Sequence, residues 1–199
     1  ASKLYERLAK EYPESPFTDN ALFRVALNAE RFFDFDKAVG AYKTLVNRHK
    51  ESPRRADALY NLALALENLQ QYKDSAREYL RYCDLFTDRE DAPEVCFRAG
   101  KVYKKMGDLK KVVATYEGFI RRYQGNKLHG DRVVDAYLQI AKAYGELKNK
   151  KKQKEYYEKT LAAFEKNKGE KSAPYGAEAK FELMEAEFEG FKKIEIKGN

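Results

Sequence analysis

Glycine, proline and cysteine are scarce in this chain of 199 residues, and tryptophan is absent: it contains 11 glycines, five prolines and two cysteines. All-β folds need frequent turn residues and apolar side chains at every second position, and neither pattern is evident here. We therefore predict an all-helical protein. No apolar run approaches the roughly 18–20 residues that a helix needs to cross a bilayer.

Motifs that would indicate an enzyme or a metal site are also missing. The sequence contains no G-x-S-x-G, no H-E-x-x-H and no glycine-rich phosphate loop. Its two histidines and two cysteines are widely spaced, whereas a structural zinc site takes about four closely spaced ligands. We expect no catalytic activity, no cofactor and no metal.

Charge is abundant but unevenly distributed. Residues 1–99 contain 16 lysines and arginines against 17 acidic residues, and residues 100–199 contain 23 against 15. The densest basic run, 148–154, falls at a predicted bend, where a solvated turn is the simpler interpretation. The run is mostly lysine and carries no base-reading motif, so we do not expect nucleic acid as a partner.

Tyrosine recurs at a nearly fixed interval. Tyr5, Tyr42, Tyr79 and Tyr116 are 37 residues apart, and Tyr157 follows after 41. Apolar residues around each tyrosine fall at i, i+3, i+4 and i+7, the spacing of amphipathic helices. A second column, upstream of the tyrosines, holds only small residues: Ala26, Ala63, Gly100 and Ala141. The chain is therefore predicted to repeat a pair of helices, with the tyrosine on the second.

Turn-forming residues separate the helices of each pair and one pair from the next. Gly107 and Asp108 split the third pair, and Pro16, Pro53 and Pro93 lie between pairs, where proline suits a helix end or a first turn. We predict a single solenoid with the following parts: a half repeat at 1–16, full repeats at 17–53, 54–90, 91–127 and 128–169, and a half repeat with a tail at 170–199.

These columns resemble the tetratricopeptide repeat, which places leucine, a small residue and tyrosine on a first helix, then alanine, an aromatic residue and proline on a second. The pattern in the first full copy is carried by Leu22, Ala26, Ala38, Tyr42 and Pro53. The copies are 37 residues long instead of about 34, which departs from the family. The resemblance implies an all-α, right-handed superhelical solenoid of antiparallel helix pairs with a non-enzymatic role in protein–protein interaction.

The pattern is incomplete at both ends. Residues 1–12 match only a second helix, and residues 175–191 match only a first helix. We expect a longer protein with further helices. Any targeting segment would then lie outside the given sequence.

Two linkers carry a narrower resemblance. "EYPESPFTDNALFRVA" and "HKESPRRADALYNLA" are similar to repeats of bacterial envelope proteins, such as the outer-membrane barrel-assembly lipoprotein and the Tol-Pal coordinator. The C-terminal "AEAKFELMEAEFEGFKKIEI" resembles envelope repeat proteins of the myxobacterial gliding machinery. These resemblances imply a periplasmic protein, held at the outer membrane through its complex, in outer-membrane assembly or gliding motility. A cytoplasmic protein is the alternative.

In the tetratricopeptide family the first helices line the concave side of the solenoid, and one of their columns points into the groove. That column contains Phe23, Tyr60, Phe97 and Leu138. The column one turn further along the helix contains Leu27, Leu64, Lys101 and Lys142. The column after that contains Glu30, Glu67 and Lys104. Side chains four residues apart share a helix face, so the resemblance implies one continuous strip.

We expect this strip to expose aromatic anchors that bind an extended or helical segment of another protein. Three other interpretations stay open. The aromatic residues could pack against neighbouring helices; the basic second half could bind an anionic polymer, a lipid or an acidic protein; or the chain could be a structural spacer that contacts neighbours through its ends.

Cys83 and Cys96 stand where other copies have apolar core residues. We expect two buried thiols, because cysteine behaves as a small core residue. A disulfide is the alternative in an oxidising periplasm, since both cysteines lie about equally far from the turn near Arg89.

Overall fold

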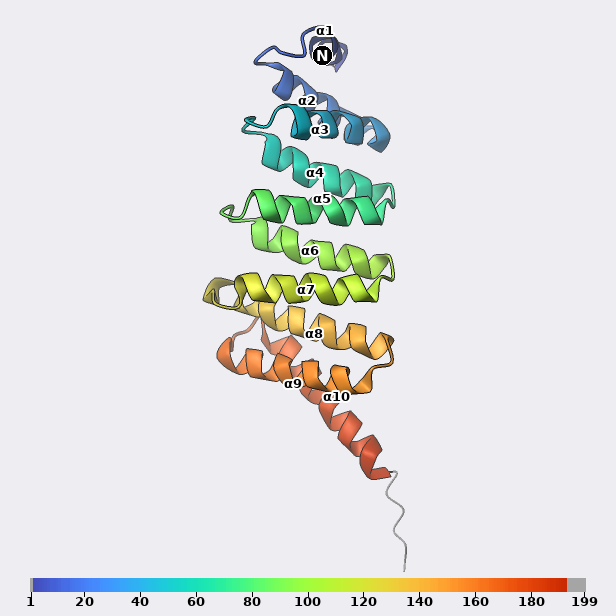
Figure 1. Cartoon of the computed structure of the whole chain (residues 1–199), viewed down its shortest axis with the longest axis vertical. Helices are drawn as coiled ribbons and strands as arrows, with labels where there is room; N and C mark the ends of the chain where they lie inside the picture. The colour runs from blue at the N-terminus through green and yellow to red at the C-terminus, as the bar shows by residue number, and fades with distance from the viewer. Residues whose placement is uncertain (1, 193–199) are drawn as a thin grey trace, which may run out of the picture. The chain divides into compact units, whose positions relative to one another are not determined.

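The computed structural model describes residues 2–192, and these residues form helices and turns without a strand (Figure 1). The helices are α1 (Ser2–Glu11), α2 (Thr18–Arg31), α3 (Phe35–Arg48), α4 (Arg55–Asn68), α5 (Tyr72–Leu85), α6 (Ala92–Lys105), α7 (Leu109–Tyr123), the short η1 (Lys127–His129), α8 (Gly130–Glu146), α9 (Lys150–Lys166) and α10 (Ala173–Lys192). The prediction of an all-helical protein is confirmed.

The helices form two compact units, one ending at Met106 and the other beginning at Gly107. In the first unit each helix from α1 to α6 packs against the next, and in the second unit α8 lies against both α7 and α9 while α10 packs mainly on α9 (Figure 1). Each unit is thus a stack of helices that run antiparallel to their neighbours. One continuous solenoid over 1–199 stays a prediction.

The bend within each full repeat has the same backbone geometry. Two positions before the second helix begins, the backbone adopts a left-handed conformation, with φ between +58° and +74°, at Phe33, Gln70, Gly107 and Lys148. A left-handed residue ends a helix by turning the chain away, and glycine suits it best because it has no Cβ. Only one of the four bends uses glycine.

Side-chain caps then start three of the second helices. Asp34 accepts a hydrogen bond from the backbone N–H of Lys37 at 3.2 Å, and Asp108 accepts one from that of Lys111 at 3.1 Å. Asn149 caps α9 in the same way. Such caps satisfy backbone donors that have no partner within the helix. The breaker residues predicted from the sequence therefore lie at real helix boundaries.

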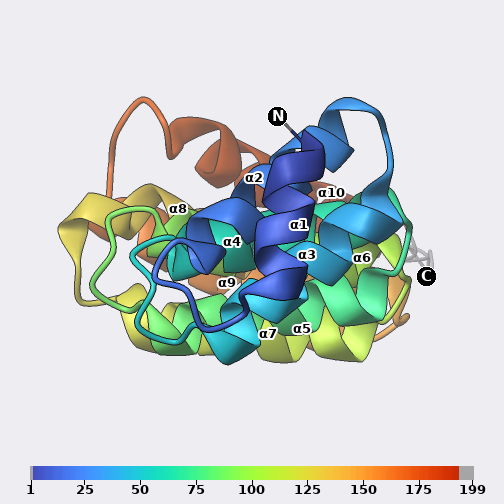
Figure 2. The same ribbon diagram turned by 90° about the horizontal axis from the view of Figure 1, so that it is seen from above.

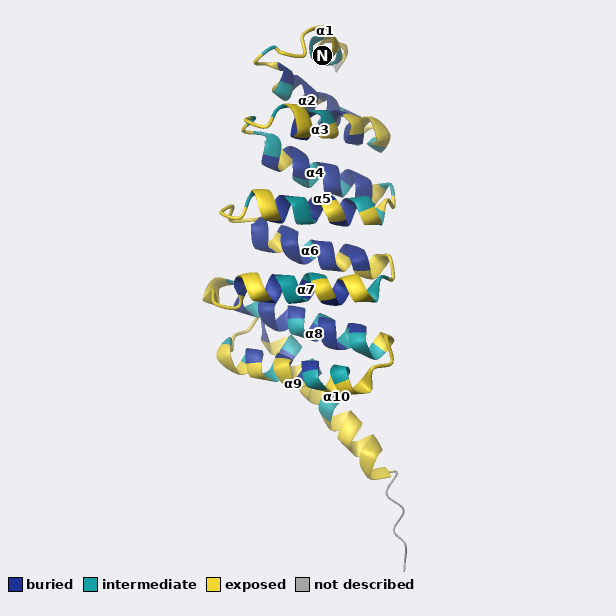
Figure 3. Ribbon diagram, viewed as in Figure 1, coloured by how far each residue is buried: buried dark blue, intermediate teal, exposed yellow. Residues whose placement is uncertain are grey.

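The recurring tyrosines fill the core of each unit. Tyr42, Tyr79 and Tyr116 are completely buried, and Tyr157 is 5% exposed. Figure 3 shows α4, α6 and α8 as mainly buried, and α3, α5 and α7 as mixtures of buried and exposed residues. Tyr5 on α1 differs, because 37% of its surface is exposed. The interval of 37 residues therefore marks packing positions.

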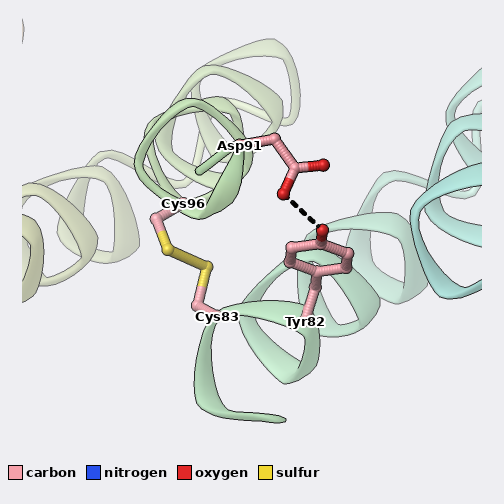
Figure 4. The surroundings of a disulfide bond; sticks show 4 residues. All are labelled: Tyr82, Cys83, Asp91 and Cys96. Atoms are coloured by element: carbon pink, nitrogen blue, oxygen red, sulfur yellow. Dashed lines mark hydrogen bonds between the residues drawn. A yellow bond between two sulfur atoms is a disulfide. The ribbon is translucent and has the colours of Figure 1, made fainter. Parts of the chain in front are cut away.

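Cys83 on α5 and Cys96 on α6 form a disulfide bond (Figure 4). Both are buried, as predicted, but the expectation of two free thiols is wrong. Adjacent antiparallel helices bring residues equally far from their common turn face to face, and the two Cα atoms lie 5.6 Å apart, within the range that a disulfide can span. Next to the bond, the Tyr82 hydroxyl donates to Asp91 at 2.7 Å.

Candidate partner-binding face

The column that was predicted to expose aromatic anchors is mostly buried. Phe23 is 7% exposed, Leu138 is 1% exposed and Phe97 is completely buried. Only Tyr60 is half-buried. The expected strip of exposed aromatic side chains is therefore wrong, and three of its four members belong to the core.

Packing inside each repeat explains this burial. The Phe23 ring meets the Tyr42 ring edge-on, with centroids 5.8 Å apart, and the Tyr60 and Tyr79 rings are 6.0 Å apart. Each pair joins a first helix to the second helix of the same repeat. The second helix thus covers the side of the first helix that the family resemblance placed in the groove.

Two acidic residues of the predicted strip bind the buried tyrosines. The Tyr42 hydroxyl donates to Glu30 at 3.0 Å, and the Tyr79 hydroxyl donates to Glu67 at 3.2 Å. In both cases the glutamate is on the first helix and the tyrosine on the second. These contacts hold the two helices of a repeat together.

Glu67 also joins α4 to α6. Its carboxylate binds Arg98 Nε at 3.1 Å and Lys105 Nζ at 2.6 Å, while only 8% of its side chain is exposed. Burial alone would raise the pKa of Glu67, but hydrogen bonds from Lys105 and Arg98, together with their positive charges, outweigh it and lower the pKa. Glu67 is therefore charged, buried and unavailable to a partner, contrary to the prediction.

Glu30 occupies the equivalent position one repeat earlier with different neighbours. Asn61 stands where the next repeat has Arg98, and it donates to the Tyr42 hydroxyl at 3.2 Å instead of binding the glutamate. Burial raises the pKa of Glu30, and the hydrogen bond from Tyr42 offsets part of that rise. One repeat therefore contains hydrogen bonds from Tyr42 and Asn61 where the next has ion pairs of Glu67 with Arg98 and Lys105, which we call the Glu67 cluster.

Five side chains beside the Glu67 cluster remain accessible, and we call them the α4–α6 face: Tyr60, Leu64, Arg98, Lys101 and Lys104. Tyr60 and Leu64 are half-buried one turn apart on α4, and Lys101 and Lys104 are exposed on α6. The Arg98 side chain is 38% exposed, and its guanidinium lies 5.7 Å from the centre of the Tyr79 ring, which also packs against Tyr60. The face therefore combines an apolar pair on α4, close to the Arg98 charge, with two exposed lysines on α6.

Two contacts beside this face are not evident from the local sequence pattern. Lys105 lies opposite Glu67, 38 residues earlier, which is one repeat length plus one residue. That spacing is the only sequence signal for the contact. The Lys101 ammonium lies 5.2 Å from the centre of the Phe97 ring, so it shields the buried aromatic residue that was predicted to be an anchor.

Leu27 and Glu30 on α2 are half-buried. In the second unit, Leu138 is buried and Lys142 forms an ion pair with Glu178 of α10 at 2.6 Å. Lys142 therefore serves packing between α8 and α10.

The basic run at 148–154 forms the bend before α9 and the first turn of that helix. Lys150, Lys151 and Lys154 are exposed, whereas Lys152 pairs with Glu155 at 3.0 Å. This arrangement is typical of a solvated helix start, and no aromatic side chain is interleaved with the exposed lysines.

Among residues 2–192 there is no cluster of three or more histidine, cysteine or acidic side chains that could hold a metal ion. The described helices are also each too short or too polar to span a membrane.

Comparison with known families agrees with the repeat architecture. Two models of the tetratricopeptide repeat match the chain, one over residues 20–52 and 57–88 and the other over residues 93–126 and 134–167. These segments cover well over half of the chain, and each lies inside one of the four predicted full repeats. The protein belongs to the tetratricopeptide repeat family.

Solved structures show the same fold. MamA has a TM-score of 0.53 and 21% identity, with 83% of this chain and 87% of that chain covered. A putative kinesin light chain of Podosopora anserina has a TM-score of 0.56 and 15% identity, with 84% of this chain and 87% of that chain covered. BtubC from P. vanneervenii has a TM-score of 0.54 and 16% identity, with 85% of this chain and 74% of that chain covered.

At these identities the likeness concerns the fold alone. No curated protein sequence matches the chain. The comparisons do not support the narrower resemblance to envelope and motility proteins, which stays a proposal.

Proposed function

We propose that this protein is a non-enzymatic scaffold whose α4–α6 face binds a segment of another protein carrying both apolar and acidic side chains. The observation that carries the proposal is the Glu67 cluster. Because Glu67 on α4 holds Arg98 and Lys105 of α6, we infer that the exposed Lys101 and Lys104 of α6 lie near the apolar pair Tyr60 and Leu64 of α4. An ordered cationic surface next to an aromatic side chain suits such a segment.

Selection from a displayed library of random 16-residue peptides tests this proposal, because the library samples many candidate segments at once. We expect the selected peptides to be rich in leucine or aromatic residues and in aspartate or glutamate. Their affinity, measured by fluorescence polarisation, should fall roughly tenfold for Tyr60→Ala and for Lys101→Glu, because interface anchors carry contributions of that order. Lys110→Glu, at an exposed position on α7, is the matched control.

Two rival functions predict different results. If the protein is an electrostatic binder that uses its basic second half, the triple change of Lys150, Lys151 and Lys154 to glutamate should abolish binding while Tyr60→Ala leaves it unchanged. A structural spacer would yield no enriched peptides. Either outcome contradicts the proposed face.

We also propose that the protein works in an oxidising compartment, the bacterial periplasm, within an outer-membrane-associated complex. The Cys83–Cys96 disulfide supports this location, because cytosolic thiols are normally kept reduced. A role in outer-membrane assembly or gliding motility rests on the linker resemblances alone. Alkylation of the native protein in intact cells tests the location: a protein whose two thiols both react in cells would be cytoplasmic.

A further inference from the structure

The fourth full repeat is longer than the other three at one end. Helices α8 and α9 have 17 residues each, whereas each helix from α2 to α6 has 14. Helix α8 begins 11 residues before the small residue Ala141, but α4 begins only eight residues before Ala63. Helix α9 ends nine residues after Tyr157, but α5 ends six residues after Tyr79. Because α8 and α9 are antiparallel, both additions lie at the same end, and each adds nearly one helical turn.

The added turns lie beside two connections, residues 127–131 and 166–172, which line a cavity of about 520 Å³. Figures 1 and 2 show the yellow start of α8 and the orange-red loop after α9 at the same end of the second unit. The two connections fit together closely, because a Cβ at Gly130 would overlap the Asn167 side chain. Both connections are internal to the chain. The other full repeats stack without such added turns, so the solenoid itself does not require this cavity.

Hydrogen bonds hold the second connection in a defined shape. The Ser172 hydroxyl is buried and donates to the backbone carbonyl of Asn167 at 2.7 Å. Asn167 Nδ2 in turn donates to the backbone carbonyl of Ala163 at 2.8 Å. Lys168 and Lys171, which line the cavity, are therefore carried by an ordered loop.

Lysine dominates the charge around this cavity. Its charged lining residues are Lys127, Lys166, Lys168, Lys171, Asp131 and Glu170, so the lining has a net charge of +2. Lys168 pairs with Glu165 at 2.6 Å, but the two side chains are 60% and 62% exposed, so this pair is weak. A phosphate group suits such a lining better than a carboxylate. It carries about two negative charges on three oxygens, so it can meet several ammonium groups at once.

A smaller cavity of about 170 Å³ adjoins the first, because Lys166 and Asn167 line both. Val133 and Tyr137 of α8 and Ala163 of α9 form its apolar wall. Val133 and Ala163 are buried, and Tyr137 is half-buried. An apolar protein cavity of about 150 Å³ can hold a benzene ring. The smaller cavity therefore has the size of one ring or of a branched alkyl group.

We propose that the two cavities form one site for an organic phosphate. The phosphate group contacts Lys127, Lys166 and Lys171, and an apolar substituent of the same molecule occupies the smaller cavity. Phosphate groups of this kind occur both in soluble molecules and in lipid headgroups. The site lies at the opposite end of α9 from the basic run at 148–154, and it does not depend on the α4–α6 face.

Isothermal titration calorimetry of the 199-residue chain with phenyl phosphate and inorganic phosphate tests the proposal. We expect phenyl phosphate to bind at least roughly tenfold more tightly, because the smaller cavity removes its ring from water. Ala162 lines the smaller cavity from an exposed position, so Ala162→Phe fills that cavity without changing the core. This variant should bind phenyl phosphate only as weakly as inorganic phosphate.

Paired charge variants test the lysines. The double variant Lys166→Gln and Lys171→Gln should bind phenyl phosphate at least about tenfold more weakly than wild type, because charge-assisted hydrogen bonds contribute that much. The double variant Lys150→Gln and Lys154→Gln removes the same charge from exposed positions near the start of α9 and is the matched control. It should bind like wild type. Circular dichroism checks that each variant is folded.

Co-sedimentation with phosphatidylcholine vesicles that contain phosphatidic acid distinguishes the two sources of phosphate. Vesicle binding that the Lys166 and Lys171 double variant loses would assign the phosphate to a lipid. Binding of phenyl phosphate without vesicle binding would assign it to a soluble molecule. Three outcomes would overturn the proposal: neither probe binds, the two double variants weaken binding equally, or Ala162→Phe binds phenyl phosphate like wild type.

Discussion

The hydroxyl group of Tyr79 donates a hydrogen bond to the carboxylate of Glu67, 12 residues earlier in the chain and 3.2 Å away. Tyr42 and Glu30 repeat this relationship one copy earlier at 3.0 Å. The geometry is the same, but two cations surround Glu67, whereas Asn61 is the added polar partner in the first copy. Two equivalent carboxylates should therefore influence stability in opposite directions as the pH changes.

The pH dependence of stability should separate the two glutamates. The pKa of Glu67 is lowered, so its contribution is present above the unfolded value of about 4.3 and is lost as the pH falls through the folded value. The pKa of Glu30 is raised, so its contribution is present below the unfolded value and is lost as the pH rises through the folded value. Urea unfolding between neutral and acidic pH should show less acid destabilisation in Glu67→Gln and more in Glu30→Gln.

At neutral pH Glu67→Gln should lower the free energy of unfolding by about 1–3 kcal/mol, because hydrogen bonds to charged groups contribute that much. Glu30→Gln should change it by less than about 1 kcal/mol. If the free energy of unfolding changed equally with pH in the two variants, this account would be contradicted.

Reduction of the Cys83–Cys96 disulfide should destabilise the folded chain. The cysteines are 13 residues apart, and closing a loop of about that length stabilises a protein by about 3 kcal/mol in the chain-entropy model. Urea unfolding with and without reductant measures the difference. The double variant Cys83→Val and Cys96→Leu, which copies the apolar residues of other repeats, should not respond to reductant. Titration of two free thiols in the denatured, unreduced protein would show that the bond is absent.

Truncation should distinguish core aromatic residues from those of the α4–α6 face. Phe97 is completely buried, so Phe97→Ala should cost about 3–5 kcal/mol of stability. Tyr60 is half-buried, and Tyr60→Ala should cost less than half as much. Thermal denaturation of the two variants tests this difference. Equal losses would place Tyr60 in the core and remove it as a binding residue.

The left-handed bends offer a test of backbone conformation. Gln70 has a φ of +58°, which is unfavourable for a residue with a Cβ, so Gln70→Gly should stabilise the protein by about 0.5–1 kcal/mol. Gly107→Ala, at a φ of +74°, should destabilise it by about 1–2 kcal/mol. Asn68→Gly, nearby on α4 with ordinary helical geometry, should destabilise it and serves as the control. Thermal unfolding measures the change in stability. If Gln70→Gly and Asn68→Gly changed the stability in the same direction, this explanation would be contradicted.

The local spacing of residue types was enough to predict the helix pairs, their bends and the buried tyrosines. Apolar residues at i, i+3, i+4 and i+7 define a helix face whatever the rest of the molecule does. Asp34 and Asp108 cap the following helices through contacts only three residues away. The recurrence of Tyr42, Tyr79 and Tyr116 identified equivalent core positions because stacked repeats bury equivalent residues.

Three features required the tertiary structure. Phe23 and Phe97 proved to be core residues, because which side of a first helix is covered depends on how the neighbouring helices pack against it. Whether Cys83 reaches Cys96 depends on the distance between α5 and α6. Glu67, which reads as an accessible acid of the groove, is buried between Arg98 and Lys105 from the next repeat. The helical period determined this protein's architecture, but its accessible surface follows from contacts between residues 31 and 38 positions apart, and no local pattern encodes those contacts.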